Sequence, residues 1–188
     1  MNKIMIIFKN RLLSRLVFAL FLATLAGCGY STGSLLPSHL KTIYVDNFKN
    51  KIDIGKEVTE STRYMLYRPG LENDVTDAVA DRFVFDGNLK IAAEEDADLM
   101  LRGDLVNYRQ EALRYDSNDN IEEYRIKITV DMELTDVASD KPMWREVGFT
   151  GESTYMTTGQ FATSEDIARE EAIKDLARRI VERTVEGW

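Results

Sequence analysis

Cysteine and histidine are nearly absent from this chain of 188 residues, which contains one of each, Cys28 and His39. A single cysteine cannot form a disulfide within the chain or supply the several thiolates of a structural metal site. A lone histidine likewise cannot build a nucleophilic triad or a multi-histidine metal site. An ordinary hydrophobic core must therefore stabilise the fold.

Long apolar runs and prolines are also scarce. Only three prolines and no low-complexity tract occur, which argues against a long linker. The most apolar stretch, Leu16–Ala23, is shorter than the roughly 20 residues that a membrane-spanning helix needs. It follows a basic segment and ends in small residues, which is the order of a secretory signal peptide. We therefore predict a signal peptide over residues 1–27.

The stretch Leu25-Ala26-Gly27-Cys28 resembles the bacterial lipobox, in which the cysteine is acylated and becomes the new N-terminus. That resemblance implies acylation of Cys28, a lipidated tether over residues 28–40, and membrane attachment through the N-terminal lipid. The residue after the cysteine is Gly29, where lipoproteins retained at the inner membrane usually carry Asp. The expected location is therefore the outer membrane, facing the periplasm. The alternative is an ordinary secreted protein with a chance cysteine.

The charge of the mature chain limits its partners. Removing residues 1–27 takes away four of the 24 basic residues and none of the 32 acidic ones, which leaves a formal charge of −12. Such an acidic chain does not suit nucleic acid, nor does it suit lying flat on anionic lipid. The remaining 161 residues match one domain, which we place at residues 41–188.

The first half of that domain mixes strand and helix patterns. A β-branched and aromatic run predicts a strand over residues 41–48, and 71–86 has helical spacing with Gly87 at a C-cap position. Residues 89–92 form a short predicted strand. The segment 49–68 is compatible with a loop or with a short helix.

The second half is more regular. Residues 124–134 alternate strictly between apolar and polar side chains, which is typical of a half-buried antiparallel strand. Two further strands (99–113 and 144–155), turns at 115–120 and 138–142, and a closing helix over 164–186 complete the pattern. The sequence predicts an α+β fold in which two helices cover one face of a mostly antiparallel sheet and the other face is free to meet a partner.

No arrangement of residues indicates catalysis. Carboxylate runs occur at Glu94–Asp96, Glu122–Glu123 and Glu170–Glu171, but they fall in turns, strand ends and a helix face, where solvated surface is the default interpretation. No phosphate-binding glycine loop precedes a helix. We therefore expect no enzyme activity, no cofactor and no metal.

Aromatic and basic residues are interspersed over the three long strands. The aromatic residues are Tyr108, Tyr115, Tyr124, Trp144, Phe149 and Tyr155, and the arginines among them include Arg102, Arg109 and Arg145. Arginines beside aromatic rings on the polar face would suit the phosphates and chains of an amphiphile. The alternative is ordinary cross-strand pairing on a solvated face.

Several segments in order resemble the LptE family of lipopolysaccharide-assembly lipoproteins. They are Cys28–Tyr30, Leu36–Ile43, Pro69–Glu72, Asp86–Leu89, Ala97–Gly103, Glu123–Val130 and Glu170–Trp188. The resemblance implies two helices against one face of a four-stranded sheet, and no enzymatic activity. It also implies a protein that plugs and helps to assemble the β-barrel protein LptD and that takes part in lipopolysaccharide transport.

The chain departs from that family pattern at two places. Residues Ile52–Leu66 look like an insertion of unknown role. The turn Asp116–Asn120 carries no basic residue, although better-studied members have basic residues there for lipopolysaccharide phosphates. Arg114, Arg125 and Lys127 beside the turn are the candidate substitutes. The alternative function is a free-standing periplasmic lipoprotein that binds a lipid or small ligand.

Overall fold

The structure, a computed structural model, describes residues 36–52 and 69–186. Cys28, the signal peptide and most of the predicted insertion lie outside these residues, so the predictions made for them stand untested. Within the described residues, no helix is both long and apolar enough to cross a bilayer.

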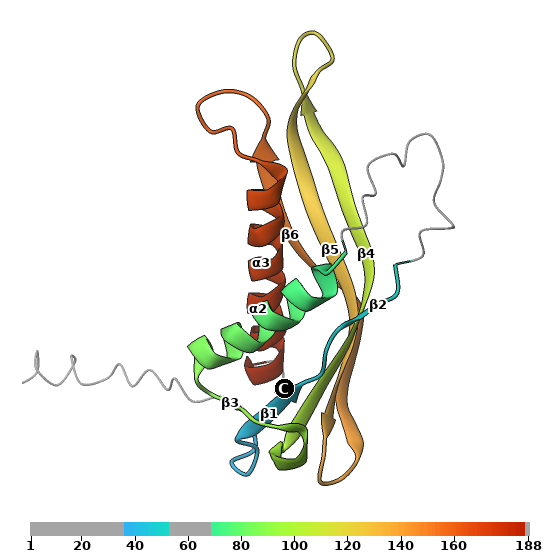
Figure 1. The fold of residues 1–188 in the computed structure, drawn as a ribbon, viewed down its shortest axis with the longest axis vertical. Coiled ribbons are helices and arrows are strands. Elements are labelled where there is room, and N and C mark those ends of the chain that lie inside the picture. The colour runs from blue at the N-terminus through green and yellow to red at the C-terminus, as the bar shows by residue number, and fades with distance from the viewer. Residues whose placement is uncertain (1–35, 53–68, 187–188) are drawn as a thin grey trace, which may run out of the picture. The chain divides into compact units, whose positions relative to one another are not determined.

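The secondary structure follows the chain in the order β1 (Thr42–Val45), β2 (Lys49–Asn50), α2 (Leu71–Asp86), β3 (Lys90–Ile91), η2 (Glu94–Asp96), β4 (Leu99–Tyr115), β5 (Ile121–Asp136), β6 (Lys141–Met156) and α3 (Glu165–Glu186). The three long strands form a meander. Figure 1 shows the β4–β5 hairpin rising beyond the helices, and α3 running beside the strands.

The prediction of a four-stranded, mostly antiparallel sheet was wrong. It has six strands in the order β3-β1-β4-β5-β6, with β2 also paired to β4. The β1–β3, β1–β4 and β2–β4 pairs are parallel, whereas β4–β5 and β5–β6 are antiparallel, so the sheet is mixed. The predicted strand 41–48 is interrupted because the chain leaves the sheet between β1 and β2, where Phe48 turns into the core.

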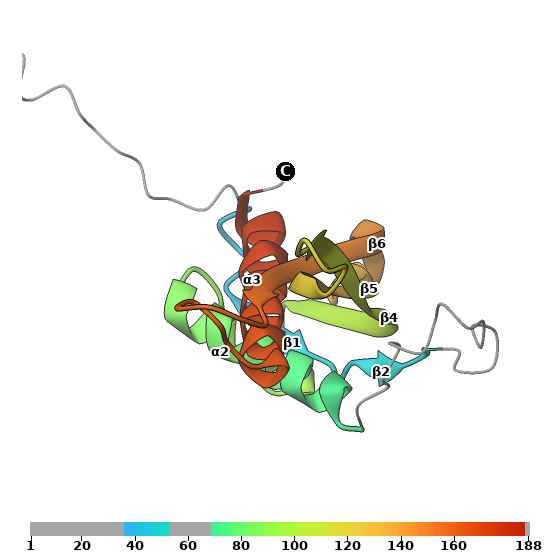
Figure 2. The same cartoon turned by 90° about the horizontal axis from the view of Figure 1, so that it is seen from above.

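Both helices pack on one face of the sheet, as the sequence predicted (Figure 2). The core face of β5 is supplied by Ile126, Ile128, Val130, Met132 and Leu134, all buried. Strict alternation over this strand is what places these side chains on one side.

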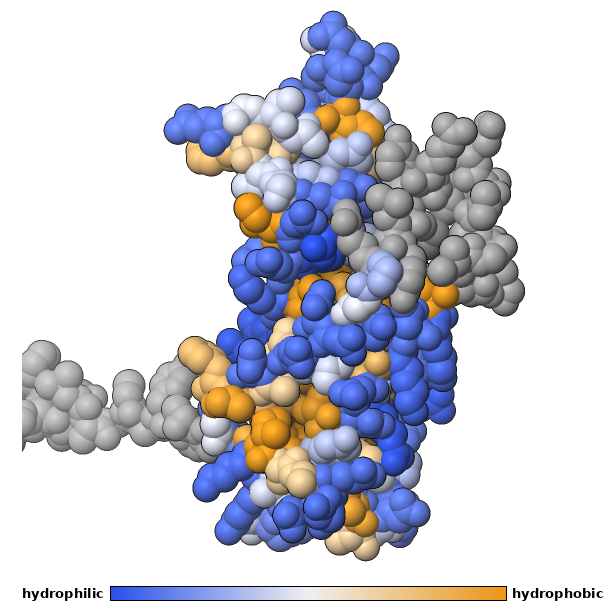
Figure 3. All heavy atoms as spheres, in the orientation of Figure 1, coloured by the Kyte–Doolittle hydropathy of each residue, from blue (hydrophilic) through white to orange (hydrophobic). Residues whose placement is uncertain are grey.

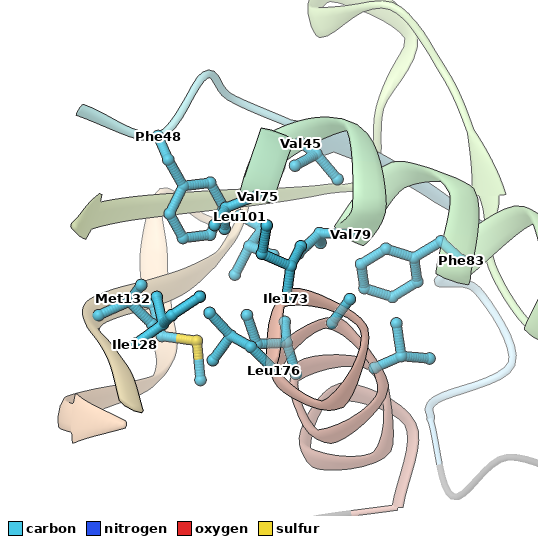
Figure 4. Close-up of a cluster of buried hydrophobic side chains, with 14 of the residues drawn as sticks. Val45, Phe48, Val75, Val79, Phe83, Leu101, Ile128, Met132, Ile173 and Leu176 are labelled. Carbon is cyan, nitrogen blue, oxygen red and sulfur yellow. The ribbon is translucent and has the colours of Figure 1, made fainter. Parts of the chain in front are cut away.

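The helices contribute apolar stripes to the same core. α2 buries Val75, Val79 and Phe83, and α3 buries Ile173 and Leu176 (Figure 4). α2 ends where the sequence predicted: Gly87 adopts φ 76°, and its N–H donates to the carbonyl oxygen of Phe83 at 3.0 Å. A glycine favours this left-handed conformation because it has no Cβ.

Two glycines allow close approaches within the core. An added Cβ at Gly103 would lie 2.0 Å from Cε1 of Phe48, and one at Gly151 would lie 2.5 Å from the backbone nitrogen of Leu176. The first neighbour is a ring that can shift. The second is helix backbone, which moves only if α3 moves.

Asp98 fastens the start of β1 to β4. Its Oδ2 accepts the backbone N–H groups of Lys41 at 2.8 Å and Thr42 at 3.0 Å, while its own N–H donates to Thr42 Oγ1. The backbone N–H of Lys41 is the main cause that holds the pKa of Asp98 below its ordinary value, because it stabilises the charged carboxylate.

We predict that Gly151→Ala lowers the free energy of unfolding by about 1–3 kcal/mol, because the new methyl group overpacks the contact between β6 and α3. Urea unfolding of the mature protein measures this. Thr154→Ala, exposed on the same strand, is the control and should change stability by less than about 0.5 kcal/mol. Equal stability of the two variants would show that α3 does not touch β6 at Gly151.

We also predict that Asp98→Asn lowers the melting temperature at pH 7 and flattens its decline in acid. A carboxylate whose pKa is depressed on folding stabilises the fold above its unfolded pKa of about 3.9, and this contribution disappears as the pH falls through the lower, folded value. Thermal melts from pH 7 to pH 2 measure the effect. Asp119→Asn, in the hairpin turn, is the control, and an identical acid decline in both variants would contradict the prediction.

Candidate functional site

The candidate site is the sheet face opposite the helices, which we call the outer face. On β5 it carries Arg125, Lys127, Thr129, Asp131 and Glu133, which alternate with the buried apolar residues and are all half-buried. The strand alternation that builds the core thereby also builds a continuous charged surface.

The three basic residues predicted from the sequence share this outer face. Arg114 pairs in register with Glu123, and Arg125 and Lys127 follow Glu123 at alternate positions along β5. Arg109 of β4 lies opposite Lys127, and Glu111 lies opposite Arg125. Irregularities in β4, between Leu105 and Asn107 and beyond Ala112, set this pairing.

The three residues differ in how far their charge is already compensated. Arg114 donates to Glu123 Oε2, and this hydrogen bond is the main cause that raises the pKa of Arg114. Arg125 Nε lies 3.8 Å from Glu152 Oε2. Lys127 forms no ion pair within the described residues. Lys127 is therefore the member of the set with the most charge left for a ligand.

The polar groups of the turn at the tip of the hairpin form hydrogen bonds with one another. Asp116 Oδ1 accepts the backbone N–H groups of Asn118 at 2.7 Å and Asn120 at 2.9 Å, and its Oδ2 accepts from the Asn120 side chain. These hydrogen bonds, led by the Asn120 side chain, lower the pKa of Asp116. The tip is a closed acidic turn, so any basic contact must come from the strands below it.

A shallow polar depression of about 270 Å³ lies lower on the outer face, and sequence reasoning missed it. Its lining includes one charge row, Arg102, Glu133 and Arg145, which are cross-strand neighbours on β4, β5 and β6. The sequence did show charges of opposite sign at positions expected on the polar face of the strands. Which of these charges are neighbours depends on the strand register, which the sequence does not give.

A second charge row crosses the same depression. Lys49, Asp104 and Asp131 are neighbours on β2, β4 and β5. Lys51 Nζ lies 2.7 Å from Asp104 Oδ2, and Asp131 Oδ1 accepts the backbone N–H of Gly148 at 2.8 Å. With both signs interspersed, the depression fits a polar protein surface better than it fits a single anion or cation.

The hypothesis of arginines beside aromatic rings on the polar face is wrong for most of the rings. Tyr108, Trp144 and Tyr155 are buried in the core, and Tyr124 stacks on Tyr155 with ring centres 5.6 Å apart. Phe149 also packs against the core. These rings share the apolar face because they occupy the same alternate positions as the aliphatic residues.

The cations that do contact these rings come from α3. The Arg183 guanidinium lies 5.2 Å from the Trp144 ring centre, and that of Arg179 lies 5.5 Å from the ring centre of Phe149. Their role is to fasten the helix to β6, since Arg183 also donates to Glu146 and Arg179 to the carbonyl oxygen of Thr150. They are structural contacts and leave the outer face as the candidate site.

Solved structures of the same general arrangement exist at low identity. The chain aligns with protein XCC0632 from Xanthomonas campestris at 12% identity and a TM-score of 0.50, covering 80% of this chain and 88% of that one. A minor lipoprotein from Acinetobacter baumannii aligns at 16% identity and a TM-score of 0.49, covering 79% and 95%.

The rare lipoprotein B from Shewanella oneidensis aligns at 15% identity and a TM-score of 0.42, covering 78% of this chain and 92% of that one. Of these three structures, only that of XCC0632 reaches a TM-score of 0.50, and at 12% identity it bears on the fold alone. No curated protein matches the chain significantly.

A family model gives a direct assignment. The model for LptE, described as lipopolysaccharide-assembly, matches residues 40–184, from two residues before β1 to the last turn of α3. Among the described residues, the match includes α2, all six strands and all but the last two residues of α3, and therefore the whole outer face. The chain belongs to the LptE family of lipopolysaccharide-assembly lipoproteins.

Proposed function

We propose that this cell-envelope lipoprotein is a non-catalytic plug and assembly partner of an LptD-type β-barrel protein in the outer membrane, and takes part in lipopolysaccharide transport and insertion at the cell surface. The family assignment supports this proposal. The single structural observation that carries it is the open, charged outer face of a domain whose two helices both pack on the other sheet face.

The dimensions of the domain suit a barrel lumen. β4, β5 and β6 have 17, 16 and 16 residues, so each strand is about 50 Å long at about 3.3 Å per residue. A bilayer with its headgroups is about 40–45 Å thick. The three-stranded meander is therefore long enough to occupy most of the height of a membrane-spanning barrel.

The chemistry of the outer face suits the same environment. The interior of an outer-membrane barrel is polar, whereas its exterior is apolar. The two charge rows of the depression would meet such a wall through polar contacts and water. Interspersed charges give specificity of orientation more than affinity, which is what a plug that must be seated in one register requires.

The lipid anchor completes the proposal. Acylation of Cys28 would tether the domain to the same membrane that holds the barrel, and would raise its local concentration beside the partner. Gly29, the residue after the cysteine, supports anchoring at the periplasmic side of the outer membrane. Activity through shape and charge needs no catalytic residues.

Lipopolysaccharide contact is assigned to Arg114, Arg125 and Lys127. All three lie on the outer face below the acidic tip, and their arrangement would present guanidinium and ammonium groups to phosphates. Lys127 is the strongest candidate because its charge is the least compensated. Glu123 and Glu152 would have to release their arginines before these bind a ligand.

The first test is recovery of the barrel. We expect the full-length protein, crosslinked in its native envelope and purified in mild detergent, to carry a large β-barrel protein with it. Reversing charges in the depression with Arg102→Glu and Arg145→Glu should reduce this recovery. Lys174→Glu on α3, a charge reversal away from the outer face, is the matched control.

Depletion of the protein should also block display of lipopolysaccharide at the cell surface. Recovery of the protein alone, with display unchanged on depletion, would contradict the plug. The free-standing alternative would then gain support if the purified protein carried a lipid in an apolar cavity.

The second test concerns the ligand. We expect Lys127→Gln to weaken binding of purified lipopolysaccharide about tenfold, because a charge-assisted hydrogen bond contributes about 1.5 kcal/mol. Lys141→Gln, an exposed lysine at the other end of the sheet, should leave binding unchanged. Equal binding by both variants, measured by fluorescence titration, would remove Lys127 from the site.

A further inference from the structure

Three exposed apolar side chains lie at the end of the domain opposite the hairpin tip, and no part of the proposed function uses them. They are Val84 and Phe85 in the last turn of α2 and Ile91 on edge strand β3, with exposed fractions of 68%, 80% and 41%. We call them the α2-end patch. Figure 3 shows hydrophobic residues gathered over this end of the molecule.

The patch lies where the chain enters the domain. β3 pairs with β1 through Thr42 opposite Lys90 and Ile43 opposite Ile91, so Ile91 is beside the first strand of the domain. Leu36, the first described residue, follows Cys28 by eight residues. An extended chain of that length spans at most about 29 Å, so an acylated Cys28 keeps this end of the domain close to the bilayer.

The size of the patch favours a lipid surface over a protein. A stable protein interface buries about 800 Å² on each partner, whereas three side chains of this kind expose far less in total, since even a large aromatic side chain covers only about 150–250 Å². A few apolar side chains are sufficient for a shallow contact with a membrane that an acyl chain already holds nearby.

The neighbouring cations fit the same location. The Arg82 guanidinium lies 5.0 Å from the Phe85 ring centre, and the exposed Lys90 directly precedes Ile91. Long cationic side chains of this kind reach from an apolar surface to the headgroup layer. The acidic turn η2, Glu94–Asp96, begins three residues after Ile91 and would repel anionic headgroups.

We propose that the α2-end patch inserts at the boundary between headgroups and acyl chains, in the leaflet that holds the acylated Cys28, and that it prefers zwitterionic lipid. The contact gives the domain a second attachment point beside its tether and so fixes its orientation relative to the bilayer. This inference rests on the lipid anchor of the proposed function and is independent of the barrel partner.

The chain offers a clean test because Cys28 is its only cysteine and acylation consumes the thiol. In the full-length lipidated protein, Phe85→Cys therefore introduces a single free thiol for a nitroxide spin label. Phe161→Cys and Val147→Cys are matched controls, since these residues are 75% and 72% exposed and lie in the β6–α3 loop and on β6. Circular dichroism verifies that each variant is folded.

The labelled proteins are placed on phosphatidylcholine vesicles without any other protein, and collision with oxygen is compared with collision with a water-soluble nickel chelate. We expect the oxygen-to-nickel ratio to be higher at position 85 than at positions 147 and 161. Replacing one quarter of the lipid with phosphatidylglycerol should lower the ratio at position 85. Equal ratios at all three positions would overturn the proposal.

Two further outcomes separate this inference from the proposed function. If mass spectrometry shows an acylated Cys28 and the label at position 85 is as accessible to the nickel chelate as the controls, the patch proposal fails and the plug proposal stands. If the label becomes protected only when a barrel partner is added, the patch is a protein contact and the bilayer contact is refuted.

Discussion

The packing of α3 against β6 is the contact on which the rest of the structure depends. At Gly151 the helix backbone comes so close that a methyl group would not fit beside Leu176. Next to that contact, Arg179 donates to the carbonyl oxygen of Thr150, and Asp175 accepts the N–H of Glu152. These are backbone groups of an edge strand, which a neighbouring strand would otherwise bind. One helix therefore buries the core face and also blocks strand addition at the middle of β6.

The position of α3 over the core face and the β6 edge determines which surfaces remain open for binding. With the helices on one face and the β6 edge occupied, binding is left to the outer face and to the two ends of the domain. The outer face carries interspersed charges of both signs. A surface of this kind discriminates by geometry, because only a partner with matching charges at strand spacing satisfies both rows of the depression. The proposed plug would require such discrimination more than affinity, since the proposed lipid anchor would already supply proximity.

The sequence predicted the regular elements and missed those that depend on distant contacts. Alternation located the core of β5, and helical spacing with Gly87 located α2, because both signals are local. The parallel pairing of β1 and β2 with β4 has no local signal, and β2 is too short to show a period. The sequence also predicted that Tyr124 packs on the core side, where it is partly buried, because it shares alternate positions with Ile126. The sequence could not predict that Lys127 forms no ion pair within the described residues, because irregularities in β4 determine which charged residues lie opposite it.

The two ends of the domain differ in chemistry, and this difference would orient the domain relative to the membrane. The hairpin tip, Asp116–Asn120, is an acidic turn closed by its own hydrogen bonds, and the exposed Leu113 and Tyr115 lie below it on β4. The opposite end combines an apolar patch with β1, the first strand of the domain, to which the proposed tether would lead. Acylation alone would hold the domain at one point and leave it free to rotate about the tether. A second apolar contact beside that point restricts the rotation, so the long hairpin would approach a barrel in one orientation. The domain would then reach its partner already oriented, and less rotational freedom would be lost on binding.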